Sequence, residues 1–542
     1  MSAKGSLTGA GVIARRLAEA GCTHAFGIPG GEVLALMDAL KQEGIRFSLC
    51  KHENAGGFMA EGVHHATGAP AVLLATVGPG VANAINVVVN AWQDQVPMIF
   101  LTGAIDPADT HTFTHQVFDH TALLKPITKA SFSVVDGAVD AIIDKAVAIA
   151  MDDRPGPVHV DVPIRVAERP ATVGAPVRRV RPAPVAPAPS RVLDEVQSHL
   201  ARAERPLMIA GIDVLHHHAE GHLQSFLQAL PMPLITTYKA KGVLPEDDPL
   251  ALGAAGLSPL ADDMLLPLVK QADLIVLAGY DPIEMRIGWR DPFDPDTTVV
   301  ELSAQANTHY MHQASYSFVG DVGAGLDAIR LDVERSVKKI WPKGEPAKLR
   351  AMLKKTFSSG GKWGPAAVVE GVRAALPRDA VVTVDTGAHR ILASQVLETY
   401  VPRGLLQSTG LCTMGVALPM AVGRKLAEPG RAVVALTGDA GLEMILGELA
   451  TLRDQKLAIP VIVFVDEQLA LIEKKQRAIG FKNLGVDFGG TDFVKAARAM
   501  GGKGVLAKSA KEVESAVKRA LKADTFTVIA CPIGKKAYEG KF

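Results

Sequence analysis

AVVALTGDAGLEMILGELATLRDQKLAIPVIVFVDEQLALIEKK, residues 432–475, is the stretch that decides the fold of this chain. Its first apolar run, Val433–Leu436, predicts a buried strand, and Gly438-Asp439-Ala440-Gly441 follows where that strand ends. An amphipathic pattern then predicts one helix from about Leu442 to Asp454, and Val461–Val465 predicts a second strand. Strand, turn, helix and strand make a βαβ unit, whose two strands are parallel and end at the same edge of a sheet.

Two acids follow these two strands, Asp439 after the first and Asp466 after the second. The small residues Gly438, Ala440 and Gly441 let backbone N–H groups approach a phosphate, and the start of the following helix adds a favourable field. Two carboxylates beside a phosphate site are best explained by a hard cation such as Mg²⁺, which bridges carboxylate and phosphate oxygens. The alternative is a plain βαβ unit in which Asp439 only caps the helix.

The bulk composition is that of a globular enzyme. With 542 residues, the chain should form about three domains. Lys+Arg and Asp+Glu balance at 57 each, so the charge indicates no nucleic-acid partner and no anionic membrane surface. The four cysteines are far apart and include no C-x-x-C, which argues against a disulfide framework or a zinc site. The first residues lack the apolar core of a signal peptide, and no apolar run has membrane-spanning length. These features predict a soluble, cytoplasmic protein.

Helical and strand patterns alternate along most of the chain, which predicts an α/β fold of three doubly wound domains with parallel sheets. We place these domains at residues 1–170, 191–332 and 360–542. The segment Arg169–Ser190 contains six prolines and is expected to be an extended linker. Residues 333–364 are rich in charge, Gly and Pro and are expected to form a second connection.

Glu53 is the other residue with a predicted chemical role. It follows a predicted strand at the start of a helix, in KHENAGGFMAEG. An acid in a first helical turn is usually a surface residue favoured by the helix dipole. Here the next residues, Ala55 to Met59, are small or apolar, which indicates a partly buried carboxyl. Desolvation favours the protonated form of such a group, so Glu53 is expected to hold or share a proton near neutral pH.

The spacing of the two acids carries a family resemblance. Asp439 and Asp466 are 27 positions apart (466 − 439), and the segment resembles the cofactor signature of thiamine diphosphate (ThDP) enzymes. The resemblance implies that Asp439 and Asp466 bind Mg²⁺ through their side chains and that Gln468 binds it through its backbone carbonyl. Ala440 departs from the usual second glycine of that signature, and Asp466 stands where asparagine is commoner.

Further segments resemble the same family, specifically its 2-oxo acid decarboxylases and acetolactate synthases, over nearly the whole chain. By this resemblance Glu53 contacts N1′ of the cofactor aminopyrimidine and promotes the imino tautomer, which deprotonates the thiazolium C2. Thr114-His115-Gln116 is similar to catabolic acetolactate synthases, which adds His115 and Gln116 to the expected catalytic residues. The residues expected to contact the cofactor are Gly78, Pro79 and Gly80 at the pyrimidine, Met414 as the prop for its bent shape, and Thr386, Gly387, Ala388, His389, Gly438, Ala440 and Gly441 at the diphosphate.

The resemblance implies a ThDP- and Mg²⁺-dependent carboligase that decarboxylates a 2-oxo acid and ligates the enamine to a second carbonyl compound. The domains would be pyrimidine-binding, middle and diphosphate-binding, in that order. The alternatives are a simple 2-oxo acid decarboxylase or C–C lyase and a non-catalytic ThDP- or flavin-binding homologue. FAD in the middle domain is possible but not favoured, because Tyr280-Asp281-Pro282 is similar to the flavin-free branch.

The same resemblance implies an obligate homodimer and favours a homotetramer, with Glu53 of one subunit serving the cofactor held by Asp439 of the other. A small-molecule 2-oxo acid is the expected partner. His216-His217-His218 with His222 could form a metal cluster, but no acid or cysteine stands at a usual ligand spacing. A solvated turn is the preferred interpretation.

Overall fold

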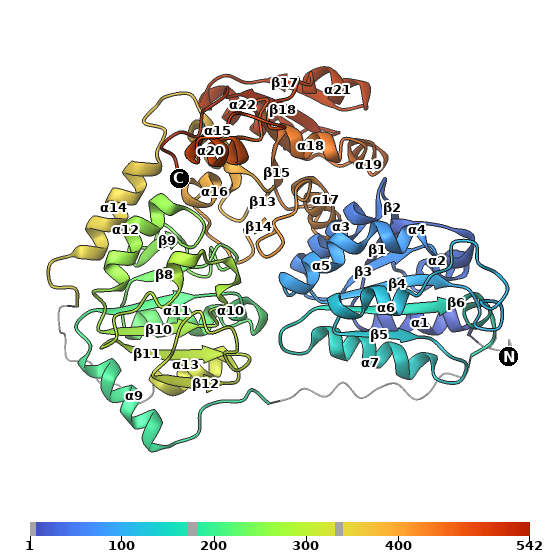
Figure 1. The fold of residues 1–542 in the computed structure, drawn as a ribbon, viewed down its shortest axis with the longest axis horizontal. Helices are drawn as coiled ribbons and strands as arrows, with labels where there is room; N and C mark the ends of the chain where they lie inside the picture. The colour runs from blue at the N-terminus through green and yellow to red at the C-terminus, as the bar shows by residue number, and fades with distance from the viewer. Residues whose placement is uncertain (1–6, 172–182, 331–339) are drawn as a thin grey trace.

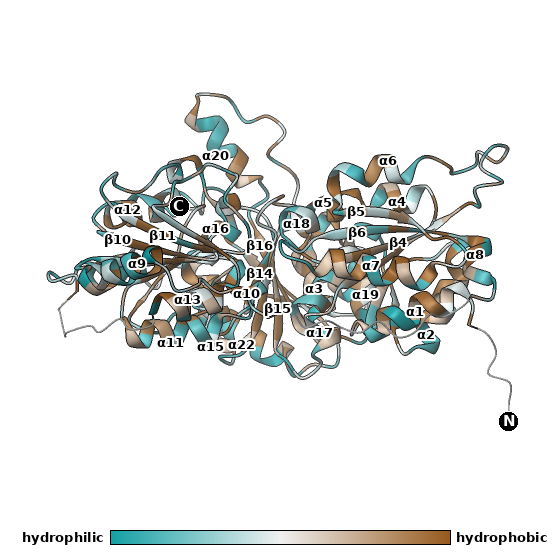
Figure 2. Cartoon of the chain, turned by 90° about the horizontal axis from the view of Figure 1, so that it is seen from below, coloured by the Kyte–Doolittle hydropathy of each residue, from teal (hydrophilic) through white to brown (hydrophobic). Residues whose placement is uncertain are grey.

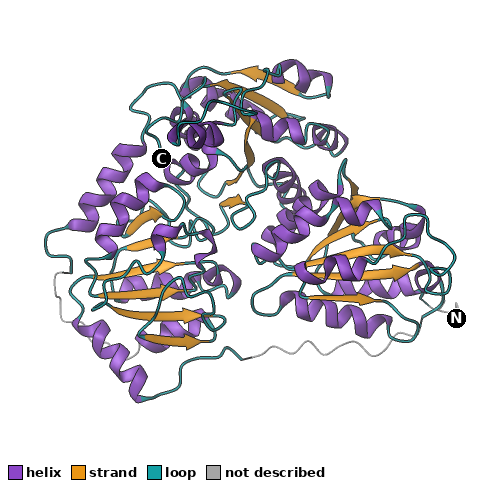
Figure 3. Cartoon of the chain, viewed as in Figure 1, coloured by secondary structure: helices purple, strands orange, loops and turns teal. Residues whose placement is uncertain are grey.

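The computed structural model describes residues 7–171, 183–330 and 340–542. It contains three six-stranded sheets, all of whose paired strands are parallel, with helices on their faces (Figures 1 and 3). The predicted α/β class with three doubly wound parallel sheets is therefore confirmed. In the described part of the chain, no helix is both long and apolar enough to cross a membrane.

The N-terminal sheet has the strand order β2-β1-β3-β4-β6-β5. Its strands are β1 (His24–Ile28), β2 (Arg46–Leu49), β3 (Ala71–Ala75), β4 (Met98–Ala104), β5 (Ala130–Ser133) and β6 (Pro157–Pro163). Its helices are α1 (Gly9–Glu19), α2 (Leu34–Gln42), α3 (Glu53–Thr67), α4 (Pro79–Asn83), α5 (Ile85–Gln93), α6 (His120–Leu124), α7 (Val139–Met151) and α8 (Ile164–Glu168).

The middle sheet has the order β12-β11-β10-β7-β8-β9, which is 3-2-1-4-5-6 when its strands are counted from β7 and read from the other edge. Its strands are β7 (Pro206–Ala210), β8 (Leu234–Thr236), β9 (Ala251–Ala254), β10 (Leu274–Ala278), β11 (Thr298–Ser303) and β12 (Tyr316–Val319). Its helices are α9 (Arg191–Arg202), α10 (Asp213–His216), α11 (Glu220–Ala229), α12 (Pro259–Val269) and α13 (Val322–Arg330).

The C-terminal sheet has the order β14-β13-β15-β16-β18-β17. Its strands are β13 (Val381–Val384), β14 (Leu405–Gln407), β15 (Val433–Gly438), β16 (Pro460–Val465), β17 (Lys503–Leu506) and β18 (Thr527–Pro532). Its helices are α15 (Pro365–Ala375), α16 (Ala388–Val396), α17 (Ala417–Ala427), α18 (Asp439–Met444), α19 (Glu448–Asp454), α20 (Ala470–Ala478), α21 (Phe493–Ala499) and α22 (Ala510–Ala520).

Two local predictions differ from the structure. The single helix expected over residues 442–454 is two helices, α18 and α19, because Ile445 leaves helical geometry and Gly447 begins a new helix. The expected second connection contains a helix, α14 (Glu345–Phe357), which packs on the middle domain through apolar side chains such as Leu353 and Phe357. Residues 172–182 of the expected linker and 331–339 lie outside the described residues. The strands of each sheet fall within one predicted domain, and the domain boundaries themselves stay predictions.

The N- and C-terminal domains share one apolar core. Central strands such as β3 are buried along their whole length, as expected for a parallel sheet covered on both faces. The largest cluster of buried apolar residues runs from Phe58 and Leu73 in the first domain to Met420 and Val461 in the third. Figure 2 shows this apolar material gathered along the sheets and the helices between them.

Helices α3 and α17 form the most extensive contact between these two domains. A Cβ atom on Gly423 would lie 1.7 Å from the carbonyl oxygen of Met59, and one on Gly62 would lie 2.2 Å from that of Met420. The two helix backbones therefore touch directly, and only glycine fits at either position. Because α3 begins at Glu53, this crossing also fixes the helix that carries the predicted acid.

We expect Gly423→Ala to lower the apparent Tm by about 5 °C, because the added methyl overpacks a rigid backbone contact at a cost of about 1–3 kcal/mol. Gly221→Ala is the matched control. Gly221 lies in α11 with no atom within 4 Å of the added Cβ, so the helix propensity of alanine should leave the Tm unchanged or raise it. Calorimetry of both variants tests this, and equal Tm values would contradict the proposed backbone contact.

Candidate active site

A cavity of about 150 Å³ lies at the carboxyl ends of β13, β15 and β16. These strands are neighbours in the C-terminal sheet, so the turns that follow them converge at one edge. The predicted diphosphate and metal residues all line this cavity: Thr386, Gly387, Ala388, His389, Met414, Gly438, Asp439, Ala440, Gly441, Asp466 and Gln468. The structure thus brings together the residues of four separate sequence segments, while their roles stay predictions.

The two acids lie in contact through the backbone. Asp439 is the first residue of α18, and its Oδ2 accepts hydrogen bonds from the N–H groups of Asp466 (3.0 Å) and Glu467 (2.7 Å). Burial raises the pKa of Asp439, and burial together with the Asp439 carboxylate raises the pKa of Asp466 to about 7. Glu467 has φ of 54°, a strained conformation for a residue other than glycine, and its N–H bond to Asp439 Oδ2 helps to hold it.

Asp385 connects the three turns around the cavity. Its Oδ1 accepts the N–H groups of Thr386 (2.8 Å), Gly415 (2.8 Å) and Val416 (3.1 Å), and its Oδ2 accepts the hydroxyl of Thr437 (2.9 Å). A Cβ on Gly441 would lie 2.1 Å from Asp385 Oδ2, so only glycine fits there. The carboxylate therefore ties together the ends of β13 and β15 and the loop that carries Met414.

Three buried polar atoms of residues that line the cavity have no hydrogen-bond partner in the described part of the chain: Thr386 Oγ1, His389 Nε2 and Gln468 Oε1. Such buried atoms are costly unless a ligand or water satisfies them. Burial lowers the pKa of His389 to about 3, so its ring is neutral, and it stacks on Phe464 with centroids 5.3 Å apart. A hydroxyl and an imidazole beside two carboxylates suit a phosphate group paired with a cation. The residues present therefore fit a magnesium diphosphate.

The remaining cavity wall is apolar. Met414, Phe464, the segment Leu469–Ile472 and Tyr538 contribute it, and Tyr538 comes from the C-terminal tail. Helix α20 carries part of this wall and projects from the body of the domain in Figure 2. This wall can exclude water from a bound organic group, while the acids opposite hold its charged end.

Glu53 lies in the N-terminal domain and is not among the residues that line this cavity. It is the first residue of α3, with 4% of its surface exposed, and its Oε2 accepts a hydrogen bond from Asn83 Nδ2 at 3.0 Å. Gly80 approaches it closely, since a Cβ there would lie 3.4 Å from Glu53 Oε1. The predicted Gly78-Pro79-Gly80 turn and Glu53 thus form a second group, separate from the diphosphate cavity within one chain.

His115 and Gln116 lie on the exposed loop between β4 and α6. The backbone carbonyl of Gln116 touches the same turn, because a Cβ on Gly78 would lie 2.4 Å from it. The side chains of His115 and Gln116 are exposed, and the His115 ring lies edge-on to that of Phe113. Their catalytic role stays a prediction that requires a partner surface.

Comparison with known proteins agrees with this geometry. Three segments match thiamine pyrophosphate (thiamine diphosphate) enzymes: the N-terminal TPP binding domain over residues 7–123, the central domain over 193–329 and the C-terminal TPP binding domain over 385–531. The acetolactate synthase of Bacillus subtilis is 31% identical over 542 residues, covering 97% of this chain and 93% of that protein. The chain belongs to the thiamine pyrophosphate enzyme family. The catabolic acetolactate synthase of Raoultella terrigena is 29% identical, covering 97% of this chain and 95% of that protein.

The family resemblance expected from the sequence is thus confirmed, and the protein is a thiamine diphosphate-dependent enzyme. Asn83 and Tyr538 contribute to this ThDP enzyme's site and were not predicted, whereas Asp385 was expected only as the first residue of the diphosphate turn that continues to His389. Asp385 carried a usable signal, because it follows an apolar strand in the same way as Asp439 does. The histidines at 216, 217 and 222 pair separately with Asp213, Asp153 and Asp327, and the one group in the described residues that could hold a metal ion does not include them.

Asp385 gives this ThDP enzyme a pH-dependent stability. Burial raises its pKa from 3.8 to about 6, although four hydrogen-bond donors favour its charged form. The native state therefore binds more protons than the unfolded chain between these values, and the contribution of Asp385 to stability falls as pH rises through about 6. In Asp385→Asn the amide oxygen still accepts the three N–H groups, and no charge develops. The Tm of this variant minus that of the wild type should therefore increase between pH 4 and 7.

Differential scanning calorimetry across this pH range measures that difference. Asp385→Ala is the control that lacks the acceptor, and its Tm should be lower than that of the wild type at every pH. A difference between Asp385→Asn and the wild type that stays constant with pH would contradict a buried, titrating carboxyl.

Proposed function

We propose that this ThDP enzyme is an Mg²⁺-dependent carboligase of the acetolactate synthase type. It decarboxylates a 2-oxo acid and joins the remaining fragment to a second carbonyl compound. The observation that carries the proposal is the paired acids Asp439 and Asp466 beside three unsatisfied polar atoms in one cavity of the diphosphate-binding domain. The full-length similarity to proteins named acetolactate synthase supports the choice of reaction.

In this proposal the C-terminal domain binds the charged end of the cofactor. Asp439, Asp466 and the backbone carbonyl of Gln468 hold the magnesium ion, and Thr386 and His389 donate hydrogen bonds to the diphosphate. Met414 and Leu471 exclude water from the organic ring. Bound ThDP supplies the electron sink for loss of CO₂. Asp385 keeps the three turns in register without touching the cofactor.

Glu53 handles the proton at the aminopyrimidine, and Asn83 fixes the orientation of its carboxyl. Because Glu53 and the cavity are separate in one chain, we propose that a complete site forms between two subunits. Two large apolar side chains are exposed for such an interface: Phe113 (45% exposed) on the loop that carries His115 and Gln116, and Met444 (66% exposed) at the end of α18. The assembly is at least a homodimer, and two such dimers would form a tetramer.

A simple decarboxylase is the second candidate. It would release the product as an aldehyde instead of ligating it. Supplying pyruvate to the purified enzyme with ThDP and Mg²⁺ and identifying the product by mass spectrometry separates the two, because acetolactate supports the proposal and acetaldehyde alone refutes it. A panel of other 2-oxo acids then defines the donor.

FAD is not part of the proposed holoenzyme. The middle sheet has the strand order of dinucleotide-binding folds, whose ligand occupies the crevice between the first and fourth strands. Here the turns after β7 and β10 touch, since a Cβ on Gly211 would lie 2.4 Å from the Gly279 carbonyl. The buried carboxylate of Asp213 also lies at this turn, where it would repel a diphosphate.

A subunit-mixing experiment tests the shared site. Glu53→Gln and Asp439→Ala homodimers should each lose most activity, the first while still binding ThDP. If the site is shared, each mixed dimer has one site with both changes and one with neither. Random reassociation of equal amounts should therefore recover about a quarter of wild-type activity, since half of the dimers are mixed and each has one intact site. If both groups of a site came from one chain, mixing would recover nothing. Each variant mixed with itself is the control.

The charge of the metal site gives a separate prediction. A site with two carboxylates is about one unit of charge more negative than a site with an Asp/Asn pair, and the diphosphate that it binds is itself anionic. A helix N-terminus compensates only about half a charge. We expect Asp466→Asn to keep or tighten ThDP binding, because the amide still offers an oxygen ligand. Asp439→Ala should abolish binding, because it also removes the acceptor for two backbone N–H groups. Calorimetric titration with ThDP and Mg²⁺ measures both, and equal loss in the two variants would contradict the charge argument.

A further inference from the structure

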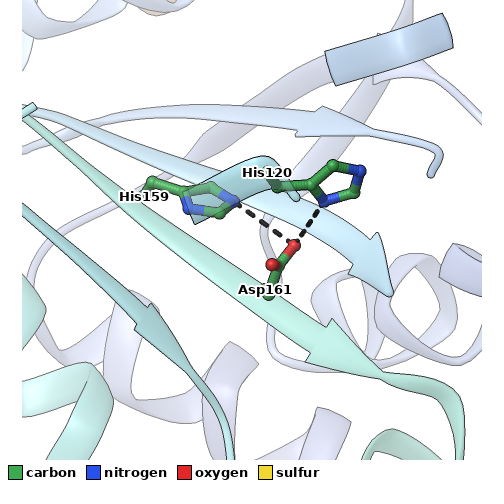
Figure 4. A group of neighbouring side chains, drawn as sticks. All are labelled: His120, His159 and Asp161. Atoms are coloured by element: carbon green, nitrogen blue, oxygen red, sulfur yellow. Dashed lines mark hydrogen bonds and ion pairs between the residues drawn. The ribbon is translucent and has the colours of Figure 1, made fainter. Parts of the chain in front are cut away.

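A buried hydrogen-bonded chain crosses the carboxyl edge of the N-terminal sheet. Figure 4 shows its centre, with the rings of His120 and His159 on either side of the Asp161 carboxylate. His120 Nδ1 lies 2.7 Å from Asp161 Oδ1, and Thr102 Oγ1 lies 2.6 Å from the same oxygen. Thr102 Oγ1 is 2.8 Å from His159 Nε2, and Ser131 Oγ is 2.6 Å from His159 Nδ1.

Adjacent strands supply these groups in register. Thr102 on β4 pairs with Asp161 on β6, and Ser131 on β5 pairs with His159 on β6. His159 and Asp161 are two positions apart and so lie on one face of β6. His120 is the first residue of α6, which covers that face. Thr102 and His159 are fully buried and His120 is 4% exposed, whereas Asp161 and Ser131 are partly buried, so the centre of the network is shielded from water.

The end of this hydrogen-bonded chain at Gly78 determines which tautomers His120 and His159 adopt. The N–H of Gly78 donates to His120 Nε2 at 3.3 Å, so that nitrogen has no proton and Nδ1 donates to Asp161. The Thr102 hydroxyl donates to Asp161 at 2.6 Å instead of to the Val160 carbonyl at 3.4 Å, so its oxygen accepts from His159 Nε2. His159 Nδ1 then accepts the hydroxyl of Ser131.

The charge on Asp161 stabilises this arrangement. Its burial raises the pKa, but the hydrogen bond from His120 Nδ1 and the nearby His159 ring, whose Nε2 lies 3.3 Å from the same oxygen, outweigh that effect and hold the pKa below its ordinary value. The charge on Asp161 strengthens both hydrogen bonds that it accepts, one from His120 and one from Thr102. The hydrogen-bonded chain ends on the backbone amide of Gly78, which neither releases nor takes up a proton. The network therefore orients groups and does not conduct protons.

The network orients the turn Gly78-Pro79-Gly80, which lies beside Glu53. Gly78 has φ of 75° and ψ of −102° and precedes α4, whose first residue Pro79 has no N–H. Gly80 in α4 lies beside the Glu53 carboxyl, and Asn83 at the end of α4 donates to it. The hydrogen bond from Gly78 to His120 therefore fixes the start of α4, the helix whose Asn83 orients the Glu53 carboxyl.

We propose that His120 is a positioning residue, held in one tautomer by Asp161, Thr102 and His159, that sets the Gly78 turn and through it the orientation of Glu53. The proposal deepens the proposed function, since it assigns the residues that align the proton-handling group. In this role His120 acts on Glu53 only through the Gly78 turn and needs no contact with cofactor or substrate.

The test compares His120→Phe, which removes the acceptor, with His120→Gln, whose amide oxygen can take the place of Nε2. Two quantities are measured: hydrogen–deuterium exchange, by mass spectrometry, of a peptide containing Gly78 in the ThDP-free protein, and kcat and KM of the holoenzyme with a 2-oxo acid. His120→Phe should exchange several-fold faster at Gly78 and lose about 10- to 100-fold in kcat, with KM changed less than about threefold. His120→Gln should recover most of both losses. Thr102→Val, which breaks the middle of the chain, should give a smaller change in the same direction.

His222→Gln is the matched control, because His222 forms an exposed pair with Asp327 at 2.8 Å in the middle domain and should behave as the wild type. Wild-type exchange and kcat in His120→Phe would overturn the proposal, and so would a His120→Gln variant as impaired as His120→Phe. A stoichiometric metal ion in the purified protein that is lost in His159→Gln would also overturn it, since these side chains would then be ligands. An inactive wild type would refute the proposed function alone, because exchange at Gly78 reports the His120 contact directly.

Discussion

Two carboxylates at neighbouring strand ends are the constraint on which this structure depends. Asp439 and Asp466 follow the paired strands β15 and β16, so the parallel sheet itself brings them to one point. Burial disfavours the charged form of both acids, and the Asp439 carboxylate further disfavours that of Asp466, so protons or a cation stabilise this buried pair. The backbone around them is nevertheless fixed, through Asp385 and through the N–H groups that Asp439 accepts. The chain thus holds an oxygen-rich cavity open at a cost in its own stability.

The arrangement of the domains follows from the same geometry. The N- and C-terminal sheets share one strand order, 2-1-3-4-6-5 in their own numbering, and both carry their chemical groups at the carboxyl edge. Helix α3 begins at Glu53, and α17 begins three residues after Met414. The glycine contact between these helices therefore holds one helix from each half of the site against the other. Within one chain this contact joins the domains without bringing Glu53 to the cavity, which is why the proposed site needs a second subunit.

The sequence predicted the parts of this molecule that depend on periodicity and spacing. Apolar runs predicted β15 and β16, and the acids at their ends predicted a shared cavity, because strand direction alone decides where those acids lie. The break between α18 and α19 was not predicted, since a lone Gly447 is compatible with a continuous helix. The network around Asp161 was also not predicted, because its members come from β4, β5, β6 and α6 and meet only through the register of the sheet. Contacts between distant segments leave no local pattern.

The separation of the two groups has a chemical reason. A carboxyl group beside a divalent cation stays ionised, because the cation favours the charged form. A carboxyl that exchanges a proton with a cofactor ring therefore has to lie away from the metal, and the proposed roles meet this requirement by placing the metal ligands and Glu53 in different domains. Such a separation removes the direct contacts that could align Glu53 with the cofactor. The alignment must then come from its own domain. There Asn83 donates to the carboxyl, the Gly78 turn lies beside it, and the charge on Asp161 holds that turn through His120.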